Sequence, residues 1–93
     1  MKKEKHILTL YIAGETHKAV RAIENINKFC AENLQNSYVL EVIDLKEHPE
    51  LASREQIIAI PTLIRKLPVP IRTLVGDLSD KEKVLIGLNI KPS

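Results

Sequence analysis

Apolar side chains follow two periods along this 93-residue chain, and these periods indicate strands and helices. Residues 6–14, HILTLYIAG, alternate in character, are rich in aliphatic residues and end in glycine, as a buried strand does. Residues 37–45, SYVLEVIDL, are almost continuously apolar, which is typical of a parallel strand covered on both faces. Between them, Thr16 is a suitable helix N-cap. One apolar stripe with helical spacing follows it: Ala19, Ala22, Ile23, Ile26, Cys30 and Leu34.

Shorter elements fill the second half of the chain. Pro49 suits the first turn of a short helix, which is expected to continue through residues 51–58. Residues 71–77 predict a strand, and residues 79–88 a helix with Ser79 and Glu82 as a capping box. The predicted order is β-α-β-α-β-β-α in one α/β domain spanning residues 1–93, with residues 1–5 as a flexible basic N-terminus. This order resembles that of thioredoxin-like folds.

Three prolines interrupt the strand-like segment 58–71, IAIPTLIRKLPVPI. Proline has no backbone N–H and therefore removes a hydrogen bond from a strand ladder. We place Pro61 at the start of the third strand, where thioredoxin-like folds commonly hold a cis peptide bond. Pro68 and Pro70 are expected in the hairpin connection, where a fixed φ and a missing donor do no harm.

Composition and charge argue against several classes of function. The net charge of +2 and the three aromatic residues, Tyr11, Phe29 and Tyr38, do not favour nucleic-acid binding. No apolar run approaches the roughly 18 residues that span a membrane. A single cysteine excludes an internal disulfide and fits a reducing compartment. Because the N-terminus also lacks a signal-peptide pattern, we expect a cytoplasmic protein without a membrane or nucleic-acid partner.

The residues that thioredoxin-like redox chemistry requires are missing. That chemistry uses a thiolate at a helix N-terminus, normally in C-x-x-C. The corresponding stretch here is 14–17, GETH, and Cys30 lies on the apolar stripe instead. The histidines are scattered and show no metal-ligand spacing. We predict no catalytic residue, cofactor or metal, and a binding function. Two alternatives stay open: an oxidoreductase that lacks C-x-x-C, and a structural homo-oligomer.

Four groups of segments together resemble the KaiB family. They are LYIAG with RAIENI, VIDLKEHPELA, IPTLIRKLPVPIR and GDLSDKEKVLIGLNI, in unbroken register over about residues 7 to 90. The resemblance implies a non-catalytic regulator that binds a KaiC-like ATPase and modulates its phosphorylation or timing cycle. A histidine kinase or another clock-type regulator is a further implied partner, and self-association as a dimer or tetramer is also implied.

The resemblance also implies a second fold. KaiB-family proteins exchange the thioredoxin-like arrangement for a tetramer-type α/β fold in which the C-terminal half is rebuilt. The implied switch residues are Pro61, Pro68, Pro70, Gly87 and Asn89. A glycine in the middle of a helix costs about 1 kcal/mol relative to alanine, so Gly87 is expected to weaken the last helix. Asn89 replaces the aspartate that is common in the family, which removes a charge.

The surface that the resemblance assigns to partners involves the first helix, the second strand and the basic hairpin. Its implied contact residues are Arg21, Glu41, Arg65, Lys66 and Arg72. The sequence departs from the family pattern where AIPTL replaces ATPTL, and where no acidic tail follows Ser93. We therefore also expect a role in a stress or timing pathway outside a true circadian oscillator.

Overall fold

The computed structural model describes residues 5–35 and 37–90 of the chain. It confirms the α/β class and the predicted element order. Of the expected flexible N-terminus, residues 1–4 lie outside the described residues. The elements are β1 (His6–Ile12), α1 (His17–Asn33), β2 (Tyr38–Asp44), α2 (Glu50–Arg54), β3 (Thr62–Leu67), β4 (Arg72–Val75) and α3 (Lys81–Gly87).

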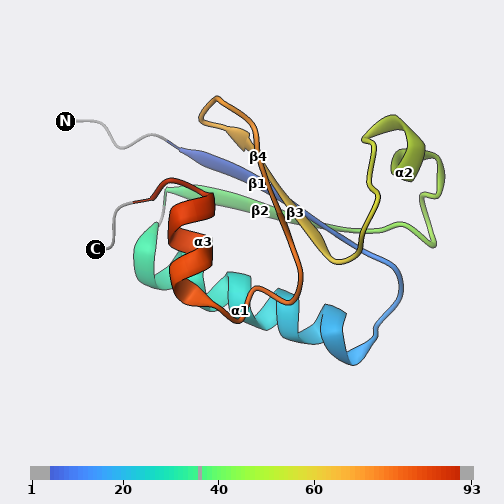
Figure 1. The fold of residues 1–93 in the computed structure, drawn as a ribbon, viewed down its shortest axis with the longest axis horizontal. Helices are drawn as coiled ribbons and strands as arrows, with labels where there is room; N and C mark the ends of the chain where they lie inside the picture. The colour runs from blue at the N-terminus through green and yellow to red at the C-terminus, as the bar shows by residue number, and fades with distance from the viewer. Residues whose placement is uncertain (1–4, 36, 91–93) are drawn as a thin grey trace.

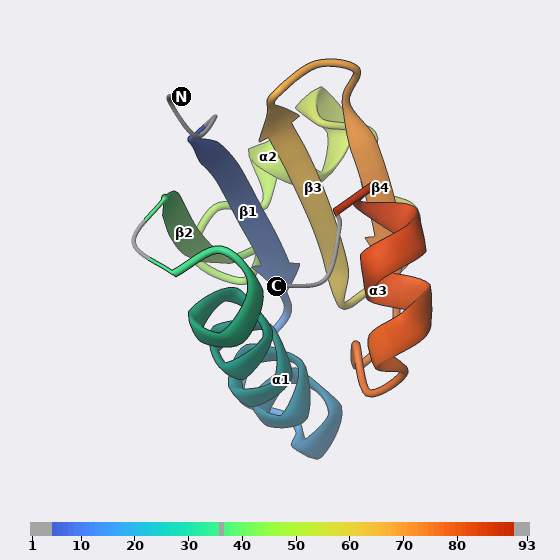
Figure 2. The same ribbon diagram turned by 90° about the vertical axis from the view of Figure 1, so that its left-hand side faces the viewer.

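The strands form one sheet in the order β2-β1-β3-β4, with helices on both faces (Figures 1 and 2). β1 runs parallel to β2 and antiparallel to β3, and β4 is antiparallel to β3. The larger core lies between the sheet and the two longer helices, around Leu8, Leu10 and Ile26. A smaller core on the other face joins Tyr11, Leu45 and Ile64 to α2.

The first helix forms as the apolar stripe predicts. The Thr16 hydroxyl accepts a hydrogen bond from the Ala19 N–H at 3.0 Å and so satisfies one of the first N–H groups of the helix. The predicted stripe is largely buried, and Phe29 joins it. This helix therefore packs one face on the sheet and leaves the opposite face to partners or solvent.

The second strand differs from its prediction, because it lies at the edge of the sheet. Val39 and Val42 are 44% and 40% exposed, so β2 is not covered on both faces. The interior positions belong to β1, which pairs with β2 and β3, and to β3, which pairs with β1 and β4. A continuous apolar run shows that a strand is hydrophobic, but it does not show how many neighbours the strand has.

The three prolines lie where the sequence predicts. Pro61 directly precedes β3, and Pro68 and Pro70 lie between β3 and β4. The peptide bonds that precede Pro61, Pro68 and Pro70 are all cis. The short helix is briefer than expected, since α2 ends at Arg54, and the chain then runs to Pro61 without a regular element.

The predicted capping box of the last helix is wrong. The N-cap of α3 is Asp80, whose carboxylate accepts from the Lys83 N–H at 3.2 Å. The N–H of Ser79 donates instead to Asp77 Oδ1. Asp80 is an equally good cap by residue type, and it lies one residue closer to the first helical turn.

The C-terminus of α3 forms a Schellman motif, which explains Asn89. Asn89 has a left-handed φ of +53°, and its N–H donates to the Ile86 carbonyl at 3.0 Å. The Ile90 N–H donates to the Leu85 carbonyl at 2.9 Å. Asparagine tolerates this backbone conformation better than most residues other than glycine. Asn89 therefore ends the helix in this fold.

The sequence suggested that Gly87 lies in the middle of the last helix. In the structure it is instead the last residue of α3. A Cβ at this position would overlap the Leu74 Cδ2 methyl group of β4. The glycine therefore allows α3 to approach the sheet closely. Glycine at position 87 lowers the helix propensity of α3, but an alanine there would disturb the packing of the helix against Leu74.

We predict that Gly87→Ala lowers the free energy of unfolding by about 1 kcal/mol, because the new methyl group overpacks against Leu74. In a Leu74→Ala background the same change should raise stability by up to about 1 kcal/mol, since only helix propensity remains. Urea unfolding of the four proteins measures both effects. Equal effects of Gly87→Ala in the two backgrounds would contradict the contact.

Candidate partner-binding surface

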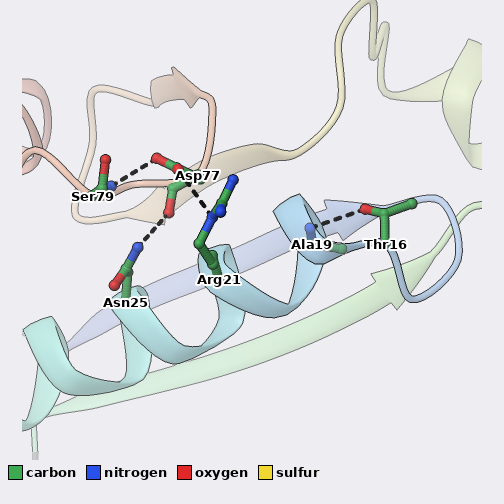
Figure 3. Close-up of polar contacts among 6 residues, drawn as sticks. All are labelled: Thr16, Ala19, Arg21, Asn25, Asp77 and Ser79. Carbon is green, nitrogen blue, oxygen red and sulfur yellow. Dashed lines mark hydrogen bonds and ion pairs between the residues drawn. The ribbon is translucent and has the colours of Figure 1, made fainter.

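Two side chains of α1 attach the β4–α3 loop to the helix (Figure 3). Arg21 Nε lies 3.5 Å from Asp77 Oδ2, and Asn25 Nδ2 donates to the Asp77 carbonyl at 2.8 Å. Asp77 also accepts from the Ser79 N–H at 3.0 Å, which forms an Asx-type turn. The side chain of Arg21 remains 61% exposed, so its charge is accessible to a partner.

The Asp77 carboxylate is electrostatically favoured in its ionised form. Hydrogen bonds from Ser79 lower the pKa of Asp77 most, and the nearby positive charges of Arg21 and Lys18 lower it further. An exposed ion pair such as that of Arg21 and Asp77 contributes little to stability. The pair is therefore better understood as positioning the guanidinium than as holding the fold together.

Lys66 forms a second polar cluster on the opposite face of the sheet. Its Nζ lies 3.1 Å from Glu55 Oε1, and the same oxygen accepts from the buried Tyr11 hydroxyl at 3.2 Å. The hydrogen bond between the charged groups raises the pKa of Lys66 and lowers that of Glu55. Burial raises the pKa of Tyr11. The Lys66 side chain is 42% exposed, and it borders a hollow of about 520 Å³.

Arg65 lies in a different environment from the one expected of a contact residue. It is only 3% exposed and packs under α3. One guanidinium nitrogen donates to the Leu88 carbonyl at the end of α3, and the other donates to the Pro70 carbonyl at 2.8 Å. Since side chains alternate along a strand, Arg65 points inward and its neighbour Lys66 points to the other face. In this fold, Arg65 is a structural residue.

The remaining predicted contacts lie at opposite edges of the sheet. Arg72 is exposed on β4 and is the register partner of Arg65. Glu41 is exposed on β2, opposite Thr9 of β1. Because β2 and β4 are the two edge strands, Glu41 and Arg72 do not share one compact patch. The predicted residues therefore describe separate surfaces.

The environment of Cys30 does not suit thiol chemistry. Cys30 is completely buried, and burial raises its pKa to about 12. The thiol is thus protonated at neutral pH, whereas a reactive cysteine needs a lowered pKa and access to solvent. Within residues 5–35 and 37–90, no group of three His, Cys, Asp or Glu side chains has metal-binding geometry. No helix in the described part of the chain is long and apolar enough to cross a membrane.

The contacts of two residues in these clusters, Asp77 and Glu55, could not be predicted from the sequence. Asp77 is readily assigned to a turn, but its contact with α1 is not, although the spacing Asp77-Leu78-Ser79 is itself the signal for an Asx turn. Glu55 falls in the expected short helix, with no indication that Tyr11 and Lys66 meet it. Glu55 lies 44 positions from Tyr11 and 11 positions from Lys66 in the chain, and local sequence patterns do not reveal such pairs.

Comparison with known sequences identifies close relatives over nearly the whole chain. A model of the KaiB domain family matches residues 9–90. The circadian clock oscillator protein KaiB of Cyanothece is 47% identical over 88 residues, which cover 95% of this chain and 84% of that protein. The protein of the same name from Synechococcus elongatus is 46% identical, with 95% and 86% covered.

Solved structures support the thioredoxin-like fold. The N-terminal domain of SasA from Synechococcus elongatus is similar with a TM-score of 0.76 and 18% identity, covering 96% of this chain and 88% of that chain. The thioredoxin Deadhead from Drosophila melanogaster is similar with a TM-score of 0.72 and 16% identity, covering 94% and 81%. At these identities the likeness shows the fold alone.

Removing the Arg65 side chain should be far more costly than removing that of Arg72. We expect Arg65→Met to lower the free energy of unfolding by about 2–4 kcal/mol, because the Leu88 and Pro70 carbonyls lose charged donors inside the protein. Arg72→Met, at the facing but exposed position, should change it by less than about 0.5 kcal/mol. Urea unfolding of both variants measures the difference, and equal effects would contradict the buried role of Arg65.

Acid should destabilise the protein through three carboxyl groups. Backbone N–H groups of Lys46 and Gly14 lower the pKa of Asp44, Lys66 lowers that of Glu55, and Ser79 lowers that of Asp77. A lowered native pKa gives stability that is present above the ordinary values of 3.8 for Asp and 4.5 for Glu. This stability is lost as the pH falls below those values through the native pKa.

We therefore predict that the urea midpoint is steady near neutral pH and declines below about pH 4.5. Asp77→Asn retains the Ser79 acceptor but cannot titrate, so its midpoint should decline less steeply than that of the wild type. A midpoint that is unchanged down to about pH 3, or identical slopes for the two proteins, would contradict this assignment.

Proposed function

Because this chain belongs to the KaiB family, we propose that it is a non-catalytic regulatory protein of clock type. Its proposed partner is a KaiC-like ATPase, whose phosphorylation or timing cycle it would modulate by binding. The proposed location is the cytoplasm. Whether the pathway is a circadian oscillator or another timing or stress response depends on the partner.

One observation carries the proposal of a binding function. A thioredoxin-like frame is present, but the loop that begins α1 has Gly14, Glu15, Thr16 and His17 where a redox protein has its thiols. The single cysteine, Cys30, is buried and protonated. The frame therefore offers surfaces and no reactive thiolate. This disfavours the oxidoreductase alternative, which an insulin-reduction assay on the wild type would test directly.

The residues proposed to contact the ATPase are Arg21, Glu41, Lys66 and Arg72. Each lies on the surface and carries a charge. Arg21 already faces Asp77, so a carboxylate on the partner would compete with an internal one. Arginine is favoured at such positions because its planar guanidinium binds carboxylates through two hydrogen bonds. Arg65 is assigned to stability in this fold.

Three further parts of the proposal come from family membership. A histidine kinase or another clock-type regulator is a proposed second partner, and the chain is proposed to self-associate as a dimer or tetramer. The tetramer-type α/β fold is proposed as an alternative state of the C-terminal half. To reach it, the chain would have to break the bonds from Arg65 to Leu88 and Pro70. Arg65 is thus a proposed determinant of the balance between the states.

The test is binding to a purified KaiC-like ATPase, measured by interferometry together with the ATPase rate. We expect Arg72→Ala to weaken binding at least about fivefold, since arginines at interface centres commonly contribute more than 1 kcal/mol. Arg54→Ala is the matched control, because Arg54 is exposed on α2 and is not a proposed contact. Absence of wild-type binding would contradict the proposed function. Equal weakening by both variants would contradict the proposed surface.

A further inference from the structure

We propose that a row of polar side chains on α1, where this helix meets the β4–α3 loop and α3, binds an acidic segment of a partner protein. Spacings of three and four positions place the members of this α1 row on one face of the helix: Lys18, Arg21, Asn25, Lys28 and Glu32. The inference rests on the binding function proposed above, but it does not require a KaiC-like ATPase as the partner. It extends the proposed contact at Arg21 to a whole surface.

The α1 row faces the C-terminal half of the chain along most of its length. Arg21 and Asn25 reach from α1 to the side chain and the carbonyl of Asp77 (Figure 3). Farther along the helix, Glu32 Oε1 lies 3.7 Å from Lys81 Nζ at the start of α3. Residues of α1, of the β4–α3 loop and of α3 therefore form one continuous polar surface.

Positive charge dominates this surface. Its cations outnumber its carboxylates, Asp77 and Glu32, and they are Lys18, Arg21, Lys28 and Lys81. Two nearby carboxylates lie outside it: Asp80 caps α3 and lines a separate hollow beside β4, and Glu24 falls outside the α1 row by its helical spacing. A surface with excess positive charge attracts an acidic partner and orients its approach.

The internal carboxylates hold these cations only weakly. The distances from Arg21 to Asp77 and from Lys81 to Glu32 are 3.5 and 3.7 Å, longer than the roughly 2.7–2.9 Å of a strong charged hydrogen bond. The Arg21 and Lys81 side chains are 61% and 59% exposed, and ion pairs in such positions contribute little to stability. Carboxylates of a partner can therefore replace the internal ones, while the bond from Asn25 to the Asp77 carbonyl keeps the loop in place.

A hollow within this surface offers a place for an apolar side chain. It has a volume of about 260 Å³ and lies between α1 and the start of α3, with Lys28 and Lys81 among its lining residues. Phe29 and Leu78 supply its apolar lining. An aliphatic side chain flanked by carboxylates matches both the hollow and the charges around it. A nucleic acid offers no aliphatic side chain, so an acidic protein segment is the better occupant.

An NMR titration with a synthetic peptide tests the surface. The probe is the peptide Glu-Glu-Leu-Glu-Glu, blocked at both ends, and the control peptide has Gln in place of each Glu. At low salt, millimolar probe should shift the amide signals of the α1 row and of Lys81, whereas the control peptide should not. Raising the salt concentration from about 0.02 to 0.3 M should weaken binding at least about tenfold, because the charges are exposed. Absence of shifts with the probe overturns the inference, as do larger shifts of the same signals by a short DNA duplex.

Lysine variants test the residues around the hollow. Lys28→Gln and Lys81→Gln should each weaken binding of the probe about threefold, as expected when an exposed ion pair is lost. Lys83→Gln is the matched control, because it removes the same charge from α3 but Lys83 lines the separate hollow beside β4. It should leave binding nearly unchanged. Equal weakening by all three variants would show an effect of net charge alone and would overturn the proposed surface.

Removing an internal carboxylate should have the opposite effect. Glu32→Gln takes away the carboxylate that pairs with Lys81, so it should strengthen binding of the probe about threefold. Glu47→Gln makes the same change of net charge at an exposed position in the turn between β2 and α2, and it should have little effect. Equal strengthening by both variants would contradict competition at the α1 row. Circular dichroism and urea midpoints establish that every variant folds.

The outcomes separate this inference from the proposed function. If the probe binds as described and no KaiC-like ATPase does, the acidic-segment surface stands and the proposed ATPase partner fails. If the ATPase binds the wild type but the probe does not bind, the proposed function stands and this surface is overturned. If both bind, and Lys28→Gln weakens both while Lys83→Gln weakens neither, the α1 row is part of the surface that the ATPase contacts.

Discussion

One buried guanidinium joins the parts of the C-terminal half. Arg65 is 3% exposed, and it donates to the carbonyl of Leu88 at the end of α3 and to that of Pro70 between β3 and β4. A cation at a helix C-terminus is favoured by the helix dipole. Removing a charged donor from buried carbonyls is costly, because no water replaces it. The position of α3 on the sheet and the path of the hairpin connection therefore depend on the same side chain.

The alternation of side chains along β3 explains why this constraint leaves the surface free for binding. Arg65 points under α3, and Lys66 points to the opposite face, where Glu55 and Tyr11 receive it. Neither position resembles the thiol site of a redox protein, and Cys30 is buried in the core. The thioredoxin-like frame thus keeps its core packed while charged groups on its surface are left exposed as proposed contacts. This arrangement accords with a regulatory member of the KaiB family.

Local patterns predicted the elements well but not their neighbours. The stripe from Ala19 to Leu34 and the positions of the prolines follow from side-chain periodicity and from the missing proline N–H, so they were readable in advance. The edge position of β2 was not, because an apolar run does not reveal how many strands flank it. Arg65 and Arg72 looked alike as basic hairpin residues. They are register partners on the same face of the sheet, and only their strands, interior β3 for Arg65 and edge strand β4 for Arg72, separate a structural arginine from a proposed contact.

Native-state hydrogen exchange tests the role of Arg65 most directly. If Arg65 couples α3 to the hairpin, the amides of Asn89 and Ile90 should exchange through the same opening event as those of β4, with one shared free energy. In Arg65→Met, that opening should become easier for both segments together, while the amides of β1 retain a higher free energy of opening. Independent exchange of Ile90 and β4, in the wild type or in the variant, would contradict the claim that one side chain holds the C-terminal half together.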